Sequence, residues 1–574
     1  MKRGVLALAA AVAATALIWP SASTAGPPYA TTEESYVVPT RHGQLYVEVV
    51  RPVDADGQAV DAPAILTMSP YSVLGRNGDA SHWAPRGYAR VWADVVGTGN
   101  SGGCFDYGGV REKESGYDLV EWLASQPWST GKVAMIGGSY NGTTATATAV
   151  MRPPHLTTIV PEAAIVRWYD YAFSGGIRYF DNNEDPSDEG VDTPLAFDFG
   201  LALPPPVDAT DPDWADRVRT TITPCDELEH TQYGYDDTPD YGAFWRERDY
   251  LRDAAKIRIP VLVAHNWGDW NVKQVNGITL YRGLTNSENR KLYMGTRWHG
   301  HGTPGGEYSA TVDAWFDHYL MGIPNGIDSM PAVHSEMSTY DGAVGWYAGP
   351  WPKTTNVTLF AQYTGGGDYQ WRLLPRPPSA PPGAPQATFV STGASTETTA
   401  NGNPRANDGW LWFETPTLAR DLRIFGEIRV RLWSTVQRRW ITFTPTIVDV
   451  DPAQRTLGPG QAIALDDRGH YSTTRGWLDS RYARTLARQS FLEPGKPFGI
   501  TIVEKPQDYT FKKGHFIGLN VQTEIDDWSL PKVDESCTTL ECRTVRIGWE
   551  DGKTTVTLPV VQAPRRPADL FESG

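Results

Sequence analysis

The sequence predicts an α/β domain with a parallel sheet, followed by an all-β domain, and three observations lead to this prediction. From Val37 to about Asp328, short apolar runs alternate with helical patterns, as a parallel sheet covered by helices requires. After Gly326 the helical period disappears, and β-rich runs separated by turn signals follow. The length of 574 residues, of which 40% are hydrophobic, is sufficient for two or three packed units.

The first domain is expected to span about 35–330. Its predicted strands are apolar runs at 64–68, 88–94, 133–137 and 260–265. The segment 167–256 interrupts the alternation and is rich in Trp, Tyr, Asp and Pro, so we interpret it as an inserted helical cap. A last helix is predicted over 310–321, because apolar side chains recur on one face at Val312, Trp315, Phe316 and Leu320.

The second domain is expected to span about 340–565. A Pro-rich connector at 375–385 precedes strand-like runs at 423–433 and 442–448. Strands without any helical period predict a β-sandwich or jelly roll.

The N-terminus has the pattern of a secretory signal peptide. Lys2 and Arg3 precede an apolar run from Val5 to Trp19, and small residues up to Ala25 suit cleavage at that point. An uncleaved membrane anchor is the alternative, but the run is shorter than the roughly 20 residues that span a bilayer. We therefore expect residues 1–25 to be removed and the mature protein to be secreted into the extracellular space.

The charge of the chain bears on its partners. The formal net charge is −16, and removal of the cations Lys2 and Arg3 with the signal peptide leaves −18. This acidity argues against nucleic acid or an anionic membrane surface as a partner.

Four cysteines in an exported chain suggest disulfide bonds. Cys537 and Cys542 are close enough in sequence to close a small hairpin loop, and Cys104 is a candidate partner for Cys225. A zinc site is the competing interpretation, but these cysteines lack the paired C-x-x-C spacing of such sites.

A glycine-flanked serine follows one of the predicted strands. The apolar run 133–137 leads into Gly138, Ser139, Tyr140, Asn141 and Gly142, and a small-residue helix is expected over 143–150. A nucleophile elbow needs small neighbours, because its serine occupies a strained turn between strand and helix. The last glycine comes three residues after the serine instead of the usual two, so the motif is a variant, and a purely structural turn is the alternative.

An acid and two histidines follow later strands. Asp269 comes directly after the strand that ends at His265, and His299 and His301 come after the next apolar run. A carboxylate at a strand end can accept the imidazole Nδ1 proton and stabilise the cation that forms during attack. The order Ser, Asp, His is the one expected of an α/β-hydrolase, although a surface-turn aspartate is the alternative.

Several segments resemble a known group of enzymes. Residues 86–103, 116–123 and 126–129, together with the G-x-S-Y-x-G form of the elbow, closely resemble the Xaa-Pro dipeptidyl-peptidase and cocaine-esterase family of hydrolases. The resemblance covers about 35–565. It implies an α/β-hydrolase core with an inserted helical cap and a C-terminal β jelly-roll domain. Residues 268–273 and 167–171 are more similar to the proline-specific peptidases of this family than to its esterases.

The resemblance also implies roles for individual residues. The oxyanion hole would use the backbone N–H of Tyr140 and the hydroxyl of Tyr71, and a donor of this kind typically accounts for about 10²–10³ in turnover. The family's histidine commonly lies four residues after the glycine at the strand end, and the spacing of Gly295 and His299 matches this. His301 stays the alternative base, and a structural role at the edge of the core stays the alternative for Tyr71.

The sequence therefore predicts a secreted serine hydrolase that releases Xaa-Pro dipeptides from peptide N-termini through an acyl-enzyme. Its expected substrate is a small peptide or ester, with no metal or organic cofactor. One alternative is a carboxylesterase or amidase of the cocaine-esterase type, and another is a carbohydrate- or surface-binding protein with an inert core. Trp267 and Trp270 are candidates for a proline pocket. The sequence does not choose among candidate counter-charges for the substrate amino terminus, which are Glu162, Asp170, Asp181, Glu184 and Asp185. Oligomeric state is equally open.

Overall fold

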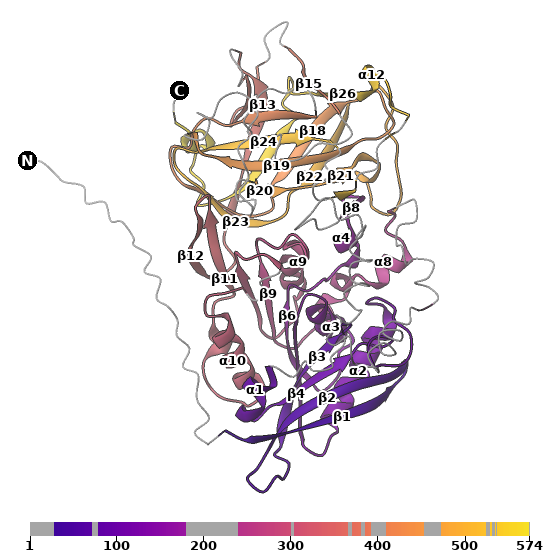
Figure 1. Cartoon of the computed structure of the whole chain (residues 1–574). Helices are drawn as coiled ribbons and strands as arrows, with labels where there is room; N and C mark the ends of the chain where they lie inside the picture. The colour runs from indigo at the N-terminus through magenta and orange to yellow at the C-terminus, as the bar shows by residue number, and fades with distance from the viewer. Residues whose placement is uncertain are drawn as a thin grey trace, which may run out of the picture.

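The protein is described by a computed structural model with two packed domains (Figure 1). The described residues are 28–71, 79–179, 225, 239–299, 304–365, 370–379, 385–391, 409–452, 472–523, 529–530, 534 and 536–572. The predicted signal peptide and most of the predicted cap lie outside them. No helix within these ranges combines the length and the apolar character needed to cross a lipid bilayer.

The first domain contains a mixed sheet whose central strands are parallel. The strand order is β1-β2-β4-β3-β5-β6-β9-β10-β11, and among these nine described strands antiparallel pairing occurs only at the β1 and β2 edge. The strands are β1 (Ala30–Thr40), β2 (Gly43–Val53), β3 (Ala62–Ser69), β4 (Ala89–Asp94), β5 (Ser129–Gly138), β6 (Leu156–Glu162), β9 (Val261–Asn266), β10 (Arg290–Gly295) and β11 (Val333–Thr339). Each of the four predicted strands coincides with one of these.

Helices cover both faces of this sheet. One apolar core joins the sheet to α2 (Val110–Ala124), α3 (Tyr140–Ala149) and α9 (Val275–Gly283). A second core joins the opposite face to α1 (Ala80–Trp83) and α10 (Tyr308–Tyr319). The four apolar residues that predicted the last helix are all buried in this second core. The helix after Ser139 begins at residue 140 instead of 143, because Ser139 itself is its N-cap residue.

The second domain is a β-sandwich with its own apolar core (Figure 1). Its strands are β13 (Thr354–Tyr363), β14 (Trp371–Leu374), β15 (Ala387–Val390), β16 (Trp410–Glu414), β17 (Leu422–Gly426), β18 (Arg429–Thr435), β19 (Thr442–Val450), β20 (Ser472–Arg475), β21 (Leu478–Asp479), β22 (Phe498–Val503), β23 (Gln507–Phe511), β24 (Phe516–Gln522), β26 (Thr544–Ile547) and β27 (Thr555–Val561). The predicted run 423–433 is divided between β17 and β18. The Pro-rich segment connects β14 to β15 inside this domain, so it does not join the two domains.

Strand pairing links the two domains at separate places. Strand β11 leaves the sheet of the first domain, forms a hairpin with β12 (Gly342–Gly349) and pairs in parallel with β23 through Ser338 and Thr339. On the other side of the molecule in Figure 1, β8 (Ile177–Tyr179) pairs with β25 (Ser529–Leu530). The hairpin of β8 with β7 (Phe173–Ser174) shows that the described part of the predicted helical cap also contains sheet.

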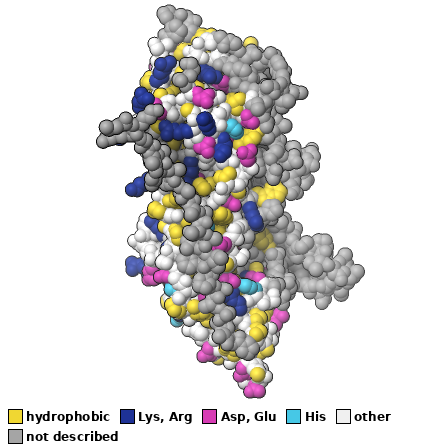
Figure 2. Space-filling view, turned by 90° about the vertical axis from the view of Figure 1, so that its left-hand side faces the viewer, with side chains coloured by type: hydrophobic (Ala, Val, Ile, Leu, Met, Phe, Trp, Pro, Cys, Tyr) yellow, Lys and Arg dark blue, Asp and Glu magenta, His cyan; other side chains and the backbone are white. Residues whose placement is uncertain are grey.

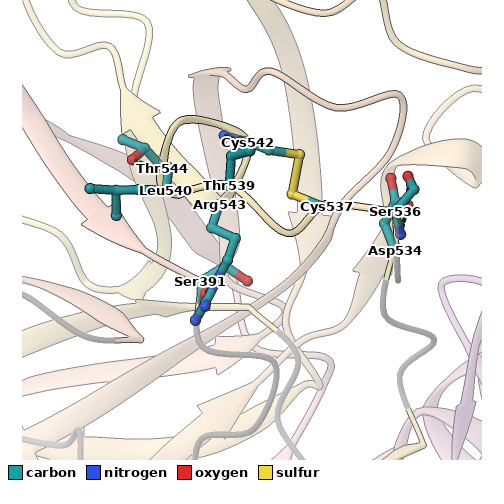
Figure 3. Close-up of a disulfide and its surroundings, with 9 residues drawn as sticks. All are labelled: Ser391, Asp534, Ser536, Cys537, Thr539, Leu540, Cys542, Arg543 and Thr544. Carbon is teal, nitrogen blue, oxygen red and sulfur yellow. Dashed lines mark hydrogen bonds between the residues drawn. A yellow bond between two sulfur atoms is a disulfide. The ribbon is translucent and has the colours of Figure 1, made fainter.

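Two disulfide bonds are present, with the pairings that the sequence suggested. Cys104 is bonded to Cys225 and Cys537 to Cys542. The second bond closes the turn at helix α12 (Leu540–Arg543), where the Thr539 hydroxyl caps the helix by accepting a hydrogen bond from the Cys542 amide at 3.2 Å (Figure 3). Arg543 fixes this turn to the sandwich by donating to the Ser391 carbonyl at 2.9 Å.

Charged side chains are distributed unevenly on one face of the molecule (Figure 2). On the side shown in Figure 2, Lys and Arg side chains are most frequent over the C-terminal sandwich at the top, and acidic side chains cluster at the lower tip. On this face, acidic and basic side chains are therefore concentrated at different ends of the molecule.

Candidate active site

The nucleophile candidate lies at the turn between β5 and α3. Ser139 has φ 59° and ψ −127°, a conformation that typically costs a non-glycine residue about 1–3 kcal/mol. The turn is tight, because a Cβ atom at Gly142 would lie 2.6 Å from the carbonyl oxygens of Gly137 and Glu162. The Ser139 amide donates to the Glu162 carbonyl at 2.9 Å, which ties the turn to β6. This strained serine has the geometry of a nucleophile elbow.

Ser139, His299 and Asp269 form a continuous chain of hydrogen bonds. His299 Nε2 lies 3.1 Å from Ser139 Oγ, and His299 Nδ1 lies 2.8 Å from Asp269 Oδ2. The three side chains come from the ends of β5, β9 and β10, which meet at one edge because these strands are parallel. The structure thus brings together the three residues predicted to form the triad, whereas His301 lies outside the described residues.

The carboxylate of Asp269 is completely buried and well supported. Its Oδ1 atom accepts a hydrogen bond from the Val272 amide at 2.9 Å, which leaves Oδ2 for His299. A second histidine, His265, places Nε2 3.5 Å from Oδ2 and 2.6 Å from the Val272 carbonyl. Burial lowers the pKa of His265, so this ring is neutral at pH 7 and donates to the carbonyl. His299 is therefore the histidine through which Asp269 can stabilise a cation.

The two predicted oxyanion donors lie near each other. Tyr140 is the first residue of α3, where a backbone N–H has no partner within the helix. Tyr71 follows β3, and its amide donates to the Ser69 hydroxyl at 3.1 Å. The rings of Tyr71 and Tyr140 pack edge to face with centroids 6.1 Å apart, so both residues are next to the elbow.

A buried carboxyl that the sequence did not suggest holds Tyr140 in place. Glu112 on α2 accepts hydrogen bonds from the Tyr140 hydroxyl at 2.9 Å and from the Gly108 amide at 3.1 Å. Burial, reinforced by nearby Asp106, raises the pKa of Glu112 to about 8, so most of it is protonated at pH 7. The Tyr140 ring also packs against Trp168, with centroids 5.0 Å apart. The amphipathic pattern of α2 places Glu112 on the buried face and is the one sequence signal that could have found it.

The residues considered for substrate binding have different surroundings. Trp267 is only 2% exposed, so the suggestion that it lines a substrate pocket is wrong. Trp270 packs edge to face with Trp477 of the C-terminal domain, with centroids 6.3 Å apart. Asp170 forms an ion pair with Arg167. Glu162 accepts from the Tyr308 hydroxyl at 2.6 Å, and burial raises its pKa. The remaining candidate counter-charges, Asp181, Glu184 and Asp185, lie outside the described residues.

This combination of sheet order, elbow and hydrogen-bonded Ser–His–Asp chain defines the α/β-hydrolase class. Comparison with family models then gives the family. Residues 42–301 match the X-Pro dipeptidyl-peptidase (S15 family), and residues 325–558 match the X-Pro dipeptidyl-peptidase C-terminal non-catalytic domain. The chain belongs to this family, which confirms the resemblance seen in the sequence.

Curated relatives carry related names at modest identity. A Bacillus anthracis protein provisionally named as an Xaa-Pro dipeptidyl-peptidase is 27% identical over 511 residues, which cover 86% of this chain and 76% of that protein. A Streptomyces avermitilis protein with the same provisional name is 27% identical over 559 residues, covering 83% of this chain and 76% of the relative.

Solved structures show the same overall fold. A CocE/NonD family hydrolase from Staphylococcus aureus has a TM-score of 0.71 at 19% identity, covering 93% of this chain and 94% of its own. An α-amino acid ester hydrolase has a TM-score of 0.66 at 19% identity, covering 96% and 99%. These structures confirm the predicted α/β-hydrolase core with a C-terminal β domain.

Proposed function

We propose that this protein is a serine hydrolase that releases Xaa-Pro dipeptides from the N-termini of peptides, with Ser139, His299 and Asp269 as its catalytic triad. The observation that carries the proposal is the hydrogen-bonded chain from Ser139 Oγ through His299 to the buried Asp269. The choice of substrate rests on the family match, in which both matching models are of X-Pro dipeptidyl-peptidase domains.

The hydrogen bonds of Ser139, His299 and Asp269 support a mechanism of acyl transfer. His299 Nε2 takes the proton of Ser139 as Oγ attacks the scissile carbonyl, and Asp269 stabilises the imidazolium through its Nδ1–H. The tetrahedral intermediate collapses when His299 returns the proton to the leaving amine. Water, activated by the same histidine, then attacks the acyl-enzyme and releases the acid.

The oxyanion is assigned to the Tyr140 amide and the Tyr71 hydroxyl. We expect Tyr71→Phe to lower kcat by about 10²–10³, because it removes one donor aimed at charge that develops only in the transition state. KM should change far less. Steady-state kinetics of the two proteins measure this, and labelling of Ser139 by a fluorophosphonate should persist in the variant. A kcat equal to that of the wild type would show that Tyr71 only packs against Tyr140.

A substrate comparison tests the proposed specificity. Wild-type protein should hydrolyse a Gly-Pro or Ala-Pro aryl amide, whereas the same amide with an acetylated amino terminus should be a much poorer substrate. Rapid turnover of a simple aryl ester without turnover of the dipeptide amides would instead assign the site to an esterase. A wild-type protein that neither turns over nor reacts with a fluorophosphonate would favour a binding role with an inert core.

We further propose that the protein is exported to the extracellular space. The pattern of residues 1–25 supports this, and so do the two disulfide bonds, which persist in oxidising compartments. N-terminal sequencing of protein from the culture medium tests it, with a mature N-terminus at Gly26 expected.

A further inference from the structure

A buried polar chain connects the C-terminal domain to the turn that carries Asp269. The indole N–H of Trp267, two residues before Asp269, donates to the Ser335 hydroxyl at 3.1 Å. Ser335 in turn donates to Asp508 Oδ2 at 2.8 Å. Asp508 lies on β23 of the sandwich, and both it and Ser335 are completely buried. The chain therefore crosses from one domain to the other without contact with water.

The far end of this chain is held by a bidentate ion pair. Arg423 on β17 donates from Nε to Asp508 Oδ1 at 2.7 Å and from Nη2 to Oδ2 at 2.8 Å. A planar guanidinium fixes the plane of a carboxylate in this geometry. Because the carboxylate can only accept, the Ser335 O–H must point toward it, which leaves a Ser335 lone pair for the indole N–H. The direction of every hydrogen bond in the chain is thereby determined.

The sandwich also contacts the backbone and the ring of Trp267. The Trp267 carbonyl accepts a hydrogen bond from the side-chain amide of Gln507 on β23 at 3.3 Å, and another from that of Gln274 in the first domain at 3.1 Å. Its ring packs edge to face on Phe425 of β17, with centroids 5.8 Å apart. Trp267 is thus oriented by residues of both domains, with Gln507 and Phe425 supplied by the sandwich.

The strand that carries Ser335 also holds the histidine side of the site. The neighbouring residue on β11, Glu336, accepts from the Thr296 amide at 2.9 Å and from its hydroxyl at 2.6 Å, three residues before His299. The turn that carries Asp269 packs directly on the segment between Thr296 and His299, since a Cβ atom at Gly268 would lie 2.9 Å from the Thr296 carbonyl oxygen. A shift of the turn that carries Asp269 would therefore disturb the alignment of the Asp269 carboxylate with the His299 ring.

We propose that Asp508 of the C-terminal domain is a positioning residue for the catalytic acid, acting on Asp269 through the Ser335 hydroxyl and the Trp267 indole. The inference rests on the proposed serine-hydrolase function and gives the C-terminal domain a part in it. Trp267→Phe removes the indole donor and keeps an aromatic ring at this position. Ser335→Ala and Asp508→Asn alter the next two residues of the hydrogen-bonded chain.

The expected result is a catalytic defect with a pH signature. A loosely held Asp269 aligns less well with His299, so kcat and the rate of fluorophosphonate labelling should fall by roughly 10- to 100-fold with KM little changed. Because Asp269 stabilises the histidine cation, its displacement should lower the pKa of the acid limb of kcat/KM. The charged or titratable groups that face this network are Arg423 and Tyr347 near Asp508 and His265 and His299 near Asp269.

A matched variant separates positioning from stability. Asp449 is an equally buried carboxylate of the same domain, held by Tyr509 and His515 at 2.9 Å each, and it is not part of the chain to Trp267. Asp449→Asn should lower thermal stability without moving the pH profile. Combining Trp267→Phe with Ser335→Ala should add little to either change alone, because both break one chain.

These measurements on the full-length chain can overturn the inference. Rates and a pH profile like those of the wild type in Trp267→Phe and Ser335→Ala would refute it, and so would an equal shift in Asp449→Asn. If Asp508→Asn does not fold, the other two variants decide the question. A wild type that no fluorophosphonate labels would refute the proposed function itself, whereas a labelled wild type with unshifted variants refutes only the positioning role.

Discussion

Ser139→Ala is expected to lower kcat by roughly 10⁴–10⁶ while leaving the protein folded. The range follows from removal of the nucleophile in a triad, after which only the oxyanion donors and substrate binding contribute. KM should stay similar, because the hydroxyl takes part in bond formation and not in holding the substrate. Steady-state hydrolysis of the dipeptide amide, with fluorophosphonate labelling followed by mass spectrometry, measures the change.

The matched control for this variant is Ser125→Ala. Ser125 is an exposed serine at the end of α2 that donates to the Trp122 carbonyl at 2.7 Å. It belongs neither to the elbow nor to the proposed triad. It should keep wild-type turnover and labelling. Substantial labelling of Ser139→Ala at another residue, with turnover retained, would show that the elbow does not carry the nucleophile.

His299→Ala should be about as damaging as the serine change, and His301→Ala should retain most of the activity. The two losses are similar because the serine and its base act as one unit, so removal of either disables the same step. His299 is the ring that bridges Ser139 Oγ and Asp269 Oδ2. Turnover of both variants as a function of pH measures the effect. A protein without its base should lose the acid limb of the pH–rate profile in addition to most of its turnover rate.

The double variant Ser139→Ala with His299→Ala supplies the control for this second prediction. It should be no slower than Ser139→Ala alone, because the base has no nucleophile left to activate. If His301→Ala were the more damaging of the two single histidine changes, the base would have to be reassigned to that residue.

Local patterns in the sequence were enough to predict the central strands and the residues that meet at their ends. Each strand is a short apolar run, and parallel strands place their following loops at one edge, so Ser139, Asp269 and His299 could be connected without a structure. Comparison with the solved structures confirms this part of the fold.

Contacts between distant segments could not be predicted in the same way. Glu112 reaches Tyr140 across 28 positions, and Ser335 reaches Asp508 across 173, and no local period marks such pairs. Trp267 was misjudged for this reason, because its burial depends on Phe425 of the other domain. The break between β17 and β18 was missed because the alternation of apolar residues continues through Ile428, which packs into the sandwich core although it belongs to neither strand.

The pairing of strands between the domains has a consequence for how substrates are recognised. Because β11 pairs with β23 on one side of the molecule and β8 with β25 on the other, rotation of one domain about either connection would break the hydrogen bonds of the other (Figure 1). We expect these two connections to oppose a hinge motion at this boundary. We therefore expect peptides to be selected by how well they fit a preformed site, and not through closure of the domains around a correct substrate.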